Sequence, residues 1–248
     1  MKLLKEEIFI CLDCETTGLN LEKDRIIEIA VIKFNFKGIL GKMETLIDPK
    51  CIIPKQSQDI HNISDEMVLG KPTIKEILPD YLKFIGDHII VGHGIKFDIN
   101  LICKEAEKNN IPCSFDNMYI DTLRLARLYG ECSVNSLESL RKHFNIEQKN
   151  PHRAYSDASI NIEIFKNLSK KFKTLNGLIS RLKNPILMKN MPLGQYKGRR
   201  FSEIPLDYLK WALRKNFDQD LLYSIKTEIK NRKDENNFQK ASSPFLDL

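Results

Sequence analysis

Apolar and polar positions alternate with different periods along the chain, and each change of period marks an expected element. Three runs rich in apolar and β-branched residues predict strands at 8–15, 25–34 and 38–48. Two shorter apolar runs predict strands at 88–91 and 118–120, each followed by helical spacing. The expected helices cover residues 73–85, 97–108, 121–129, 136–144 and 155–172. Pro79 lies inside the first of them and should bend or split it, because proline cannot donate a backbone hydrogen bond.

This order of elements predicts an α/β fold built around one mixed sheet. The first three strands are joined by short connections and should pair antiparallel, whereas the later alternation of helix and strand is typical of parallel strands. Helices should flank the sheet on both faces. Near the C-terminus, Pro205 is a favourable first residue for a short helix, and residues 218–230 predict a second one.

Composition narrows the class of protein. The chain has 248 residues, of which 42% are hydrophobic and 29% are charged, as in ordinary soluble domains. No apolar run reaches the roughly 18 residues that cross a bilayer, so we expect a cytoplasmic protein without a membrane partner. The six cysteines suggest no disulfide framework. Cys11 and Cys14 should point to opposite faces of a strand, which favours reduced thiols over a zinc site.

The net charge of +6 is distributed unevenly and suggests three parts. Residues 1–175 are neutral overall and form the expected main domain, whereas residues 176–233 carry a net charge of +8 and form a small basic helical domain. Residues 234–248 carry −2 and should be a disordered tail. A basic domain suits nucleic acid or an acidic protein partner, although a solvated lysine-rich surface would look the same.

Acidic residues follow two of the expected strands. Asp13 and Glu15 are two apart on one strand, so both side chains should leave the same face. Adjacent carboxylates repel each other unless a cation lies between them, and hard oxygen ligands suit Mg²⁺ or Mn²⁺. The alternative is a pair of solvated loop acids.

Two further segments add candidate groups. Asp98 follows another strand and would open a helix, where a carboxylate can also act as a simple N-terminal cap. Asp157 begins the long helix near residue 155, and His152 precedes it in a loop. A single histidine before a helix is often structural, so His152 gains meaning only together with the acids.

Three segments, 13–18, 93–98 and 152–157, match in order and spacing the motifs of the DEDDh (DnaQ-like) 3′–5′ exonucleases. More narrowly, residues 7–173 resemble the proofreading epsilon subunits of bacterial DNA polymerase III. The resemblance implies a ribonuclease H-like fold with a mixed five-stranded sheet. It also implies that Asp13, Glu15, Asp98 and Asp157 hold two divalent cations and that His152 is the general base. Such a pair of cations can activate water and stabilise the leaving 3′ oxygen.

The resemblance implies substrate contacts as well. Thr16 and Gly18 would bring backbone close to the terminal nucleotide, His61 would pack against its sugar and base, and Phe97 could stack on a base. Core packing is an equal alternative for Phe97. Gly94 departs from the family, in which many members have asparagine after the histidine equivalent to His93, so a side-chain contact from that position is absent here.

Residues 191–211 resemble a small uncharacterised domain that is attached to some exonucleases of this family. Its cluster of Lys197, Arg199 and Arg200 could bind phosphates of an incoming strand or an acidic face of a polymerase subunit. At the end of the chain, residues 243–248 weakly resemble a docking peptide for a sliding clamp, and an inert tail is the alternative.

The expected function is metal-dependent 3′–5′ exonuclease activity, which hydrolyses phosphodiester bonds at single-stranded or frayed 3′ ends of DNA, as in a proofreading subunit of a replicative polymerase. An exoribonuclease of the same fold, acting on RNA ends, is one alternative, because the motifs do not distinguish the sugars. A non-catalytic 3′-end-binding or polymerase-assembly module is another. Four acids and one histidine in a single pocket argue against the non-catalytic alternative.

Overall fold

The computed structural model describes residues 3–132, 134–147 and 152–241. Within them, the chain divides into two compact units. The first unit contains the residues up to Leu125 and Ser136–Ile179, and the second contains Ala126–Asn135 and the residues from Ser180 onward. The second unit therefore includes a short segment, Ala126–Asn135, from the middle of the chain.

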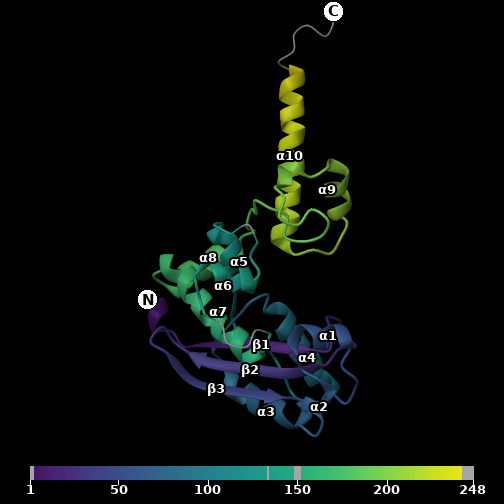
Figure 1. Cartoon of the computed structure of the whole chain (residues 1–248). Coiled ribbons are helices and arrows are strands. Elements are labelled where there is room, and N and C mark those ends of the chain that lie inside the picture. The colour runs from purple at the N-terminus through teal and green to yellow at the C-terminus, as the bar shows by residue number, and fades with distance from the viewer. Residues whose placement is uncertain (1–2, 133, 148–151, 242–248) are drawn as a thin grey trace, which may run out of the picture. The chain divides into compact units, whose positions relative to one another are not determined.

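The first unit is built on one mixed sheet of five strands (Figure 1). The strands are β1 (Phe9–Thr16), β2 (Ile26–Phe34), β3 (Ile39–Leu46), β4 (Ile89–Gly92) and β5 (Tyr119–Asp121), in the spatial order β3-β2-β1-β4-β5. The first three pair antiparallel, and β4 lies parallel to both β1 and β5. The predicted α/β class and the mixed five-stranded sheet are confirmed.

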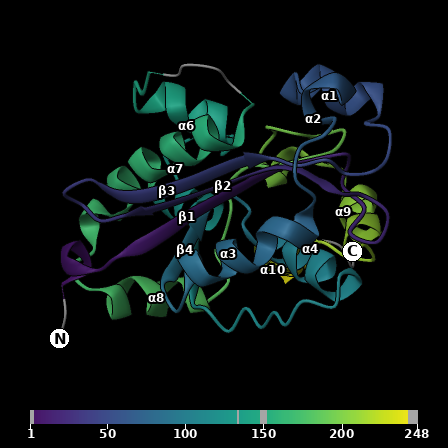
Figure 2. The ribbon, with the colours of Figure 1, turned by 90° about the horizontal axis from the view of Figure 1, so that it is seen from below.

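Helices cover both faces of this sheet, and Figure 2 shows α6 and α7 on one side of the strands and α3 and α4 on the other. The helices that begin in this unit are α1 (Lys55–His61), α2 (Asp65–Val68), α3 (Ile74–Ile85), α4 (Lys96–Lys108), α5 (Thr122–Tyr129), α6 (Leu137–His143), α7 (Ala154–Leu168) and α8 (Leu175–Lys183). Three-residue 3₁₀ turns lie at Leu4–Glu6, Ser169–Lys171 and Phe201–Glu203. Among the described residues, no helix combines the length and the apolar character that crossing a bilayer requires.

Of the two effects expected of Pro79, bending or splitting its helix, splitting is not found, because α3 runs unbroken from Ile74 to Ile85. A capping box fixes its first turn, where the Glu76 carboxylate accepts from the Thr73 backbone N–H at 2.6 Å. Its apolar face is buried against the sheet through Leu78 and Tyr81. These contacts offset the one backbone hydrogen bond that proline removes.

The two faces of β1 enter two different cores because its side chains alternate. Ile10 and Leu12 join a large aliphatic core under α3 and α4. On the other face, Phe9 packs edge-on against Phe165 of α7 with ring centroids 5.1 Å apart. Both phenylalanines are buried, so α7 is fixed against the sheet by well-packed aromatic contacts. Since α7 carries one of the motif acids, this packing also fixes one wall of the site.

The second unit has a small apolar core of its own around α9 (Leu206–Ala212) and α10 (Gln219–Ala241). Arg127, from its inserted segment, pairs with Asp218 at 2.8 Å and with the fully buried Asp220 at 3.0 Å. The helix expected at 218–230 is longer than expected. Residues 234–241 continue α10 and are helical rather than disordered, since no glycine or proline interrupts them. The suggested docking peptide at 243–248 lies outside the described residues.

Candidate active site

The acids of the first and third motifs meet at the C-terminal end of β1. One carboxylate oxygen from each of Asp13, Glu15 and Asp157 can be chosen so that all three lie within 4.8 Å of one another. Asp13 and Glu15 point to the same face of β1, and Asp157 comes from the first turn of α7. Three oxygen ligands at this spacing fit a hard divalent cation.

Asp98 approaches the same strand from α4. Its Oδ1 accepts a hydrogen bond from the backbone N–H of Cys14 at 3.2 Å, between the two acids of β1. Ile95 is the N-cap residue, and its side chain makes no capping hydrogen bond. The Asp98 carboxylate lies in the first turn, where its own backbone N–H lowers its pKa in opposition to burial. Asp98 also adds a fourth carboxylate beside Asp13 and raises the pKa of that residue.

The crowded carboxylates have raised pKa values. Burial, together with the charge of Asp157, raises the pKa of Glu15 to about 8. Burial also raises the pKa of Asp157 to about 6, against the opposing effect of His152. The pKa values of Asp13 and Asp98 are also raised, chiefly by burial. Without a cation, the site therefore keeps protons at neutral pH, whereas bound divalent cations would favour the ionised forms.

His152 lies in the short loop before α7. Its side chain is exposed to solvent, and its backbone N–H bonds to the Asp157 carboxylate, which lowers the pKa of that acid. The backbone of His152 has φ +57°, in the left-handed region that few non-glycine residues adopt, although histidine enters it more readily than most. Such backbone strain persists only where neighbouring contacts enforce it.

Glu28 of β2 supplies those contacts, and motif reasoning missed it. Its carboxylate is fully buried, faces Glu15 in the β1–β2 register, and is bound by Arg153 Nε at 3.0 and 3.1 Å. The Ala154 backbone N–H donates to the same carboxylate at 2.9 Å. Glu28 thus fixes the two residues that follow His152. One signal was available: Glu28 is the sole acid within the apolar run of β2.

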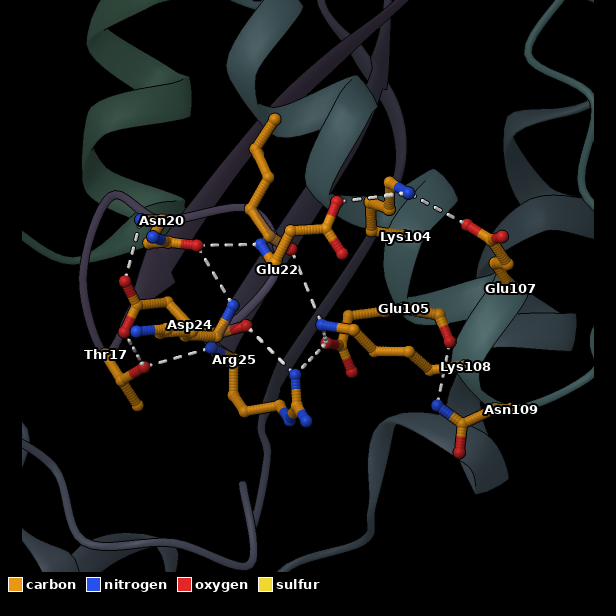
Figure 3. A network of polar contacts seen from close by, with 12 residues as sticks. Thr17, Asn20, Glu22, Asp24, Arg25, Lys104, Glu105, Glu107, Lys108 and Asn109 are labelled. Atoms are coloured by element: carbon orange, nitrogen blue, oxygen red, sulfur yellow. Dashed lines mark hydrogen bonds and ion pairs between the residues drawn. The ribbon is translucent and has the colours of Figure 1, made fainter.

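The turn between β1 and β2 is held in place by polar contacts to α4 (Figure 3). Asp24 accepts from the Thr17 hydroxyl at 2.9 Å and from the Asn20 backbone N–H at 2.7 Å. Arg25 then reaches Glu105 of α4, a buried acid, at 3.2 Å. These contacts connect the end of β1, which carries Asp13 and Glu15, to the helix that carries Asp98.

Gly18 has a structural reason to be glycine in this turn. A Cβ at this position would lie 2.5 Å from an oxygen of Asp24, closer than real Cβ atoms come. Thr16 also serves the turn, because its hydroxyl donates to the Gly18 carbonyl at 2.7 Å. Their predicted contacts with the terminal nucleotide stay predictions.

The second motif is anchored on β5. The Gly94 backbone N–H donates to Asp121 at 2.9 Å, and His93 Nδ1 lies 3.1 Å from the Thr122 hydroxyl. Gly94 has φ +70°, a conformation that glycine adopts without cost and that asparagine tolerates better than most residues. The departure from the family at Gly94 therefore preserves the backbone turn that positions α4.

The remaining substrate candidates differ in environment. His61 ends α1 and is buried; its Nδ1 accepts from the Ile63 N–H at 3.0 Å, and its ring also interacts with the Thr16 backbone at the end of β1. Burial lowers the pKa of His61, so the ring is neutral near neutral pH. Phe97 is half-buried and packs against the aliphatic core, in line with the core-packing alternative.

The three basic candidates of the second unit share one exposed turn. Lys197, Arg199 and Arg200 are all exposed, and none forms an ion pair with another described residue. Backbone hydrogen bonds hold this turn, for example from Gly198 N–H to the Met191 carbonyl at 2.8 Å. We call this segment, residues 194–200, the basic turn; it presents positive charges that no described acid neutralises.

Comparison with known proteins agrees with this geometry. Residues 10–165 match the exonuclease family, and residues 180–229 match a family described as a putative quorum-sensing-regulated virulence factor. The chain belongs to the exonuclease family, as the motifs predicted. It is therefore a nuclease, an enzyme that hydrolyses phosphodiester bonds.

Individual relatives narrow the resemblance. DNA polymerase III subunit epsilon of Aquifex aeolicus is 35% identical over 163 residues, which are 65% of this chain and 80% of that protein. The epsilon subunit of Treponema pallidum is 32% identical over 187 residues, which are 73% of this chain and 86% of that protein. The PolC-type DNA polymerase III of Clostridium perfringens is 36% identical over 169 residues, but this chain spans only 12% of that polymerase.

Solved structures show the same fold. Exonuclease X in complex with 5′ overhanging duplex DNA superposes with a TM-score of 0.56 at 25% identity, over 71% of this chain and 99% of that one. A zinc-bound complex of E. coli exonuclease I with single-stranded DNA gives a TM-score of 0.62 at 20% identity. The match covers 71% of this chain and 42% of that one. The second likeness supports the fold alone.

Removing Arg153 should destabilise the first unit. In an Arg153→Ala variant the buried Glu28 loses its bidentate partner, so we expect the free energy of unfolding to fall by about 3 kcal/mol. Urea unfolding measures the change. Arg141→Ala is the matched control, since it removes an arginine from the more exposed ion pair with Glu138 and should cost about 1 kcal/mol or less. Equal losses in the two variants would contradict the role of Glu28.

Stability without divalent cations should depend on pH in a defined direction. The pKa of Glu15 rises from 4.5 to about 8 in the folded chain, so its protonation stabilises the fold below pH 4.5 and that contribution is lost as the pH rises through about 8. In EDTA, we expect the melting temperature to fall by about 4 °C or more across this window. Mg²⁺ should restore stability more at the alkaline end.

Glu15→Gln should flatten this dependence, measured by thermal unfolding at several pH values. Glu107→Gln, which alters an exposed acid of α4, should leave it unchanged. If the melting temperature of the unmodified chain rises with pH in EDTA, the crowding of carboxylates at this site is refuted.

Proposed function

We propose that this chain is a metal-dependent 3′–5′ exonuclease that removes nucleotides from DNA ends and proofreads for a replicative DNA polymerase. The observation that carries the proposal is the cluster of Asp13, Glu15 and Asp157 oxygens within 4.8 Å, with Asp98 beside it. The epsilon-type relatives support the proofreading assignment.

The four carboxylates would hold two divalent cations, Mg²⁺ or Mn²⁺. When bound, such cations activate the attacking water and stabilise the leaving oxygen. Four ionised acids balance the charge of two divalent cations, so the site would be neutral before the phosphate arrives. His152 is proposed to take the proton from water, a role that suits an imidazole near neutral pH. Glu28 and Arg153 hold the loop from which it acts.

Substrate binding is proposed at the groups around this cluster. His61 is proposed to pack against the sugar and base of the terminal nucleotide, because its buried ring interacts with the backbone of Thr16, which would approach the same nucleotide. The backbone at Thr16 and Gly18 would approach the same nucleotide. Phe97 would contact a base with the part of its ring that the core leaves open.

The biological setting follows from the relatives and is part of the proposal. The chain would act in the cytoplasm beside the catalytic subunit of a polymerase, and a sliding clamp is a further candidate partner. RNA ends are the competing substrate, since the described site contains no group that distinguishes a 2′-hydroxyl by itself. We place DNA first because the two epsilon relatives, whose own length this chain covers to 80% and 86%, are DNA polymerase subunits.

A gel assay with Mg²⁺ tests the substrate. Single-stranded DNA, a duplex with a matched 3′ end, a duplex with a mismatched 3′ end and the equivalent RNAs should be compared. We expect faster removal from single-stranded and mismatched DNA ends, because a matched end must first be melted. Preference for RNA would keep the mechanism and refute the proofreading role.

Asp13→Ala tests the site itself. This variant should lose hydrolysis down to the assay background while keeping its circular dichroism spectrum, because the carboxylate is replaced at a crowded position that already disfavours charge. Asp80→Ala, an exposed acid of α3, is the matched control and should retain full activity. Cleavage that survives in Asp13→Ala would refute the site and would leave the metal-dependent mechanism without support.

The basic turn is tested by salt dependence. The triple variant Lys197/Arg199/Arg200→Ala should bind single-stranded DNA with a weaker dependence on salt, by a slope of about 0.7 for each lost phosphate contact. Hydrolysis of a single-nucleotide ester should be unchanged, since that substrate needs the catalytic site alone. An unchanged slope would exclude these residues from DNA binding and would favour docking to an acidic protein.

A further inference from the structure

Trp211 is a large aromatic residue of the second unit that lies at its surface. It is the only tryptophan in the chain, and 47% of its surface is exposed on α9. Its neighbours Leu209 and Ala212 are buried in the small core of the second unit, whereas Trp211 is exposed. A large aromatic side chain left at the surface is a common feature of binding sites.

Two tyrosines extend Trp211 into a row of rings. The ring centroids of Tyr208 and Trp211 are 5.2 Å apart, and those of Tyr196 and Tyr208 are 4.7 Å apart. Lys215 Nζ lies 4.8 Å from the Trp211 centroid. Both tyrosines are half-buried against the core, so the row is anchored at one end and exposed at Trp211.

The basic turn is shaped to lie against this row. Gly194 has φ +75°, and a Cβ there would come within 2.7 Å of the Tyr208 hydroxyl. Glycine therefore lets the turn approach the ring closely. Because Tyr196 belongs to the same turn as Lys197 and Arg199, the rings and the positive charges are held together before any ligand binds.

The charge around the rings is strongly positive. Residues 189–215 contain seven basic and two acidic residues. One of the acids, Asp207, is already opposite Lys210 at 3.8 Å. Arg214 on the far side of Trp211 is exposed and has no ion pair among the described residues, like the three cations of the turn. Positive side chains thus lie on either side of the aromatic row along the sequence.

We propose that Tyr196, Tyr208 and Trp211 form a stacking platform for the bases of single-stranded nucleic acid, with the surrounding lysines and arginines binding its phosphates. Aromatic rings beside cations are the chemistry by which proteins hold single strands without reading sequence. An acidic protein would need the charges but not the rings. The inference rests on the proposed function for the class of ligand, but it assigns a second binding site, outside the catalytic carboxylates.

The platform would help the enzyme by keeping a nucleic-acid strand bound to the chain. A strand held on the second unit stays tethered to the chain that carries the catalytic site, which raises its effective concentration there. We therefore expect the platform to influence long substrates and to have no effect on a single-nucleotide ester.

The single tryptophan makes the test direct. An oligothymidylate of about twelve nucleotides, long enough for one such site, is titrated into the full chain in EDTA so that nothing is cleaved. Stacking of a base on Trp211 should quench its fluorescence in a saturable way. Inorganic polyphosphate and polyglutamate, which carry charge without bases, should cause little quenching and should compete weakly.

Variants then measure the contribution of the rings. Trp211→Ala should weaken binding of a fluorescently labelled oligothymidylate by about tenfold, as expected for the loss of one stacked base. Tyr223→Ala, which removes another exposed aromatic residue of the same unit, is the matched control and should bind normally. Circular dichroism checks that both variants are folded.

The outcomes separate this inference from the proposed function. Equal binding by Trp211→Ala and the unmodified chain, or equal competition by polyglutamate, would overturn the platform and favour an acidic protein partner. Hydrolysis of a thymidine 5′-monophosphate nitrophenyl ester reports the catalytic site alone. If that hydrolysis is absent while oligothymidylate still quenches Trp211, the catalytic proposal fails and the platform stands.

Discussion

Repulsion between carboxylates at the end of β1 is the constraint on which the rest of the first unit depends. Asp13, Glu15, Asp98 and Asp157 come from three elements. Burial raises the pKa values of all four, and at Asp13 and Glu15 the charges of the neighbouring acids raise them further. A flexible scaffold would let these groups move apart. The sheet, α4 and α7 must therefore be fixed by contacts that do not involve the acids themselves.

Those contacts are distributed around the cluster. Phe9 and Phe165 fix α7 against the sheet, and the Arg25–Glu105 pair ties the β1–β2 turn to α4. Glu28 completes the arrangement from β2, because it binds Arg153 and the first turn of α7. A buried negative charge thus serves as an anchor a few residues from a group of acids that would otherwise spread. The same anchor holds His152 in its uncommon backbone conformation.

Much of this could be predicted from the sequence, and the failures have physical causes. Motif order located the acids, because each follows a strand or opens a helix whose periodicity is strong. Glu28 could not be recognised as an anchor, since its partner Arg153 is distant in sequence and their contact depends on β-strand register. Local propensity predicted that Pro79 would bend or split its helix, and the tertiary packing of Leu78 and Tyr81 keeps α3 unbroken. The ring row needed the structure, as spacing alone made Trp211 look like one more helix residue.

The insertion of residues 126–135 into the second unit has a consequence for how the chain acquires its structure during synthesis. Residues that complete the first unit, 136–179, leave the ribosome after this segment and before the rest of the second unit. Arg127 must therefore wait for Asp218 and Asp220 while the catalytic unit folds around the sequence on either side of it. The second unit is consequently the last part of the described chain to form, and until it does, Arg127 lacks its partners Asp218 and Asp220.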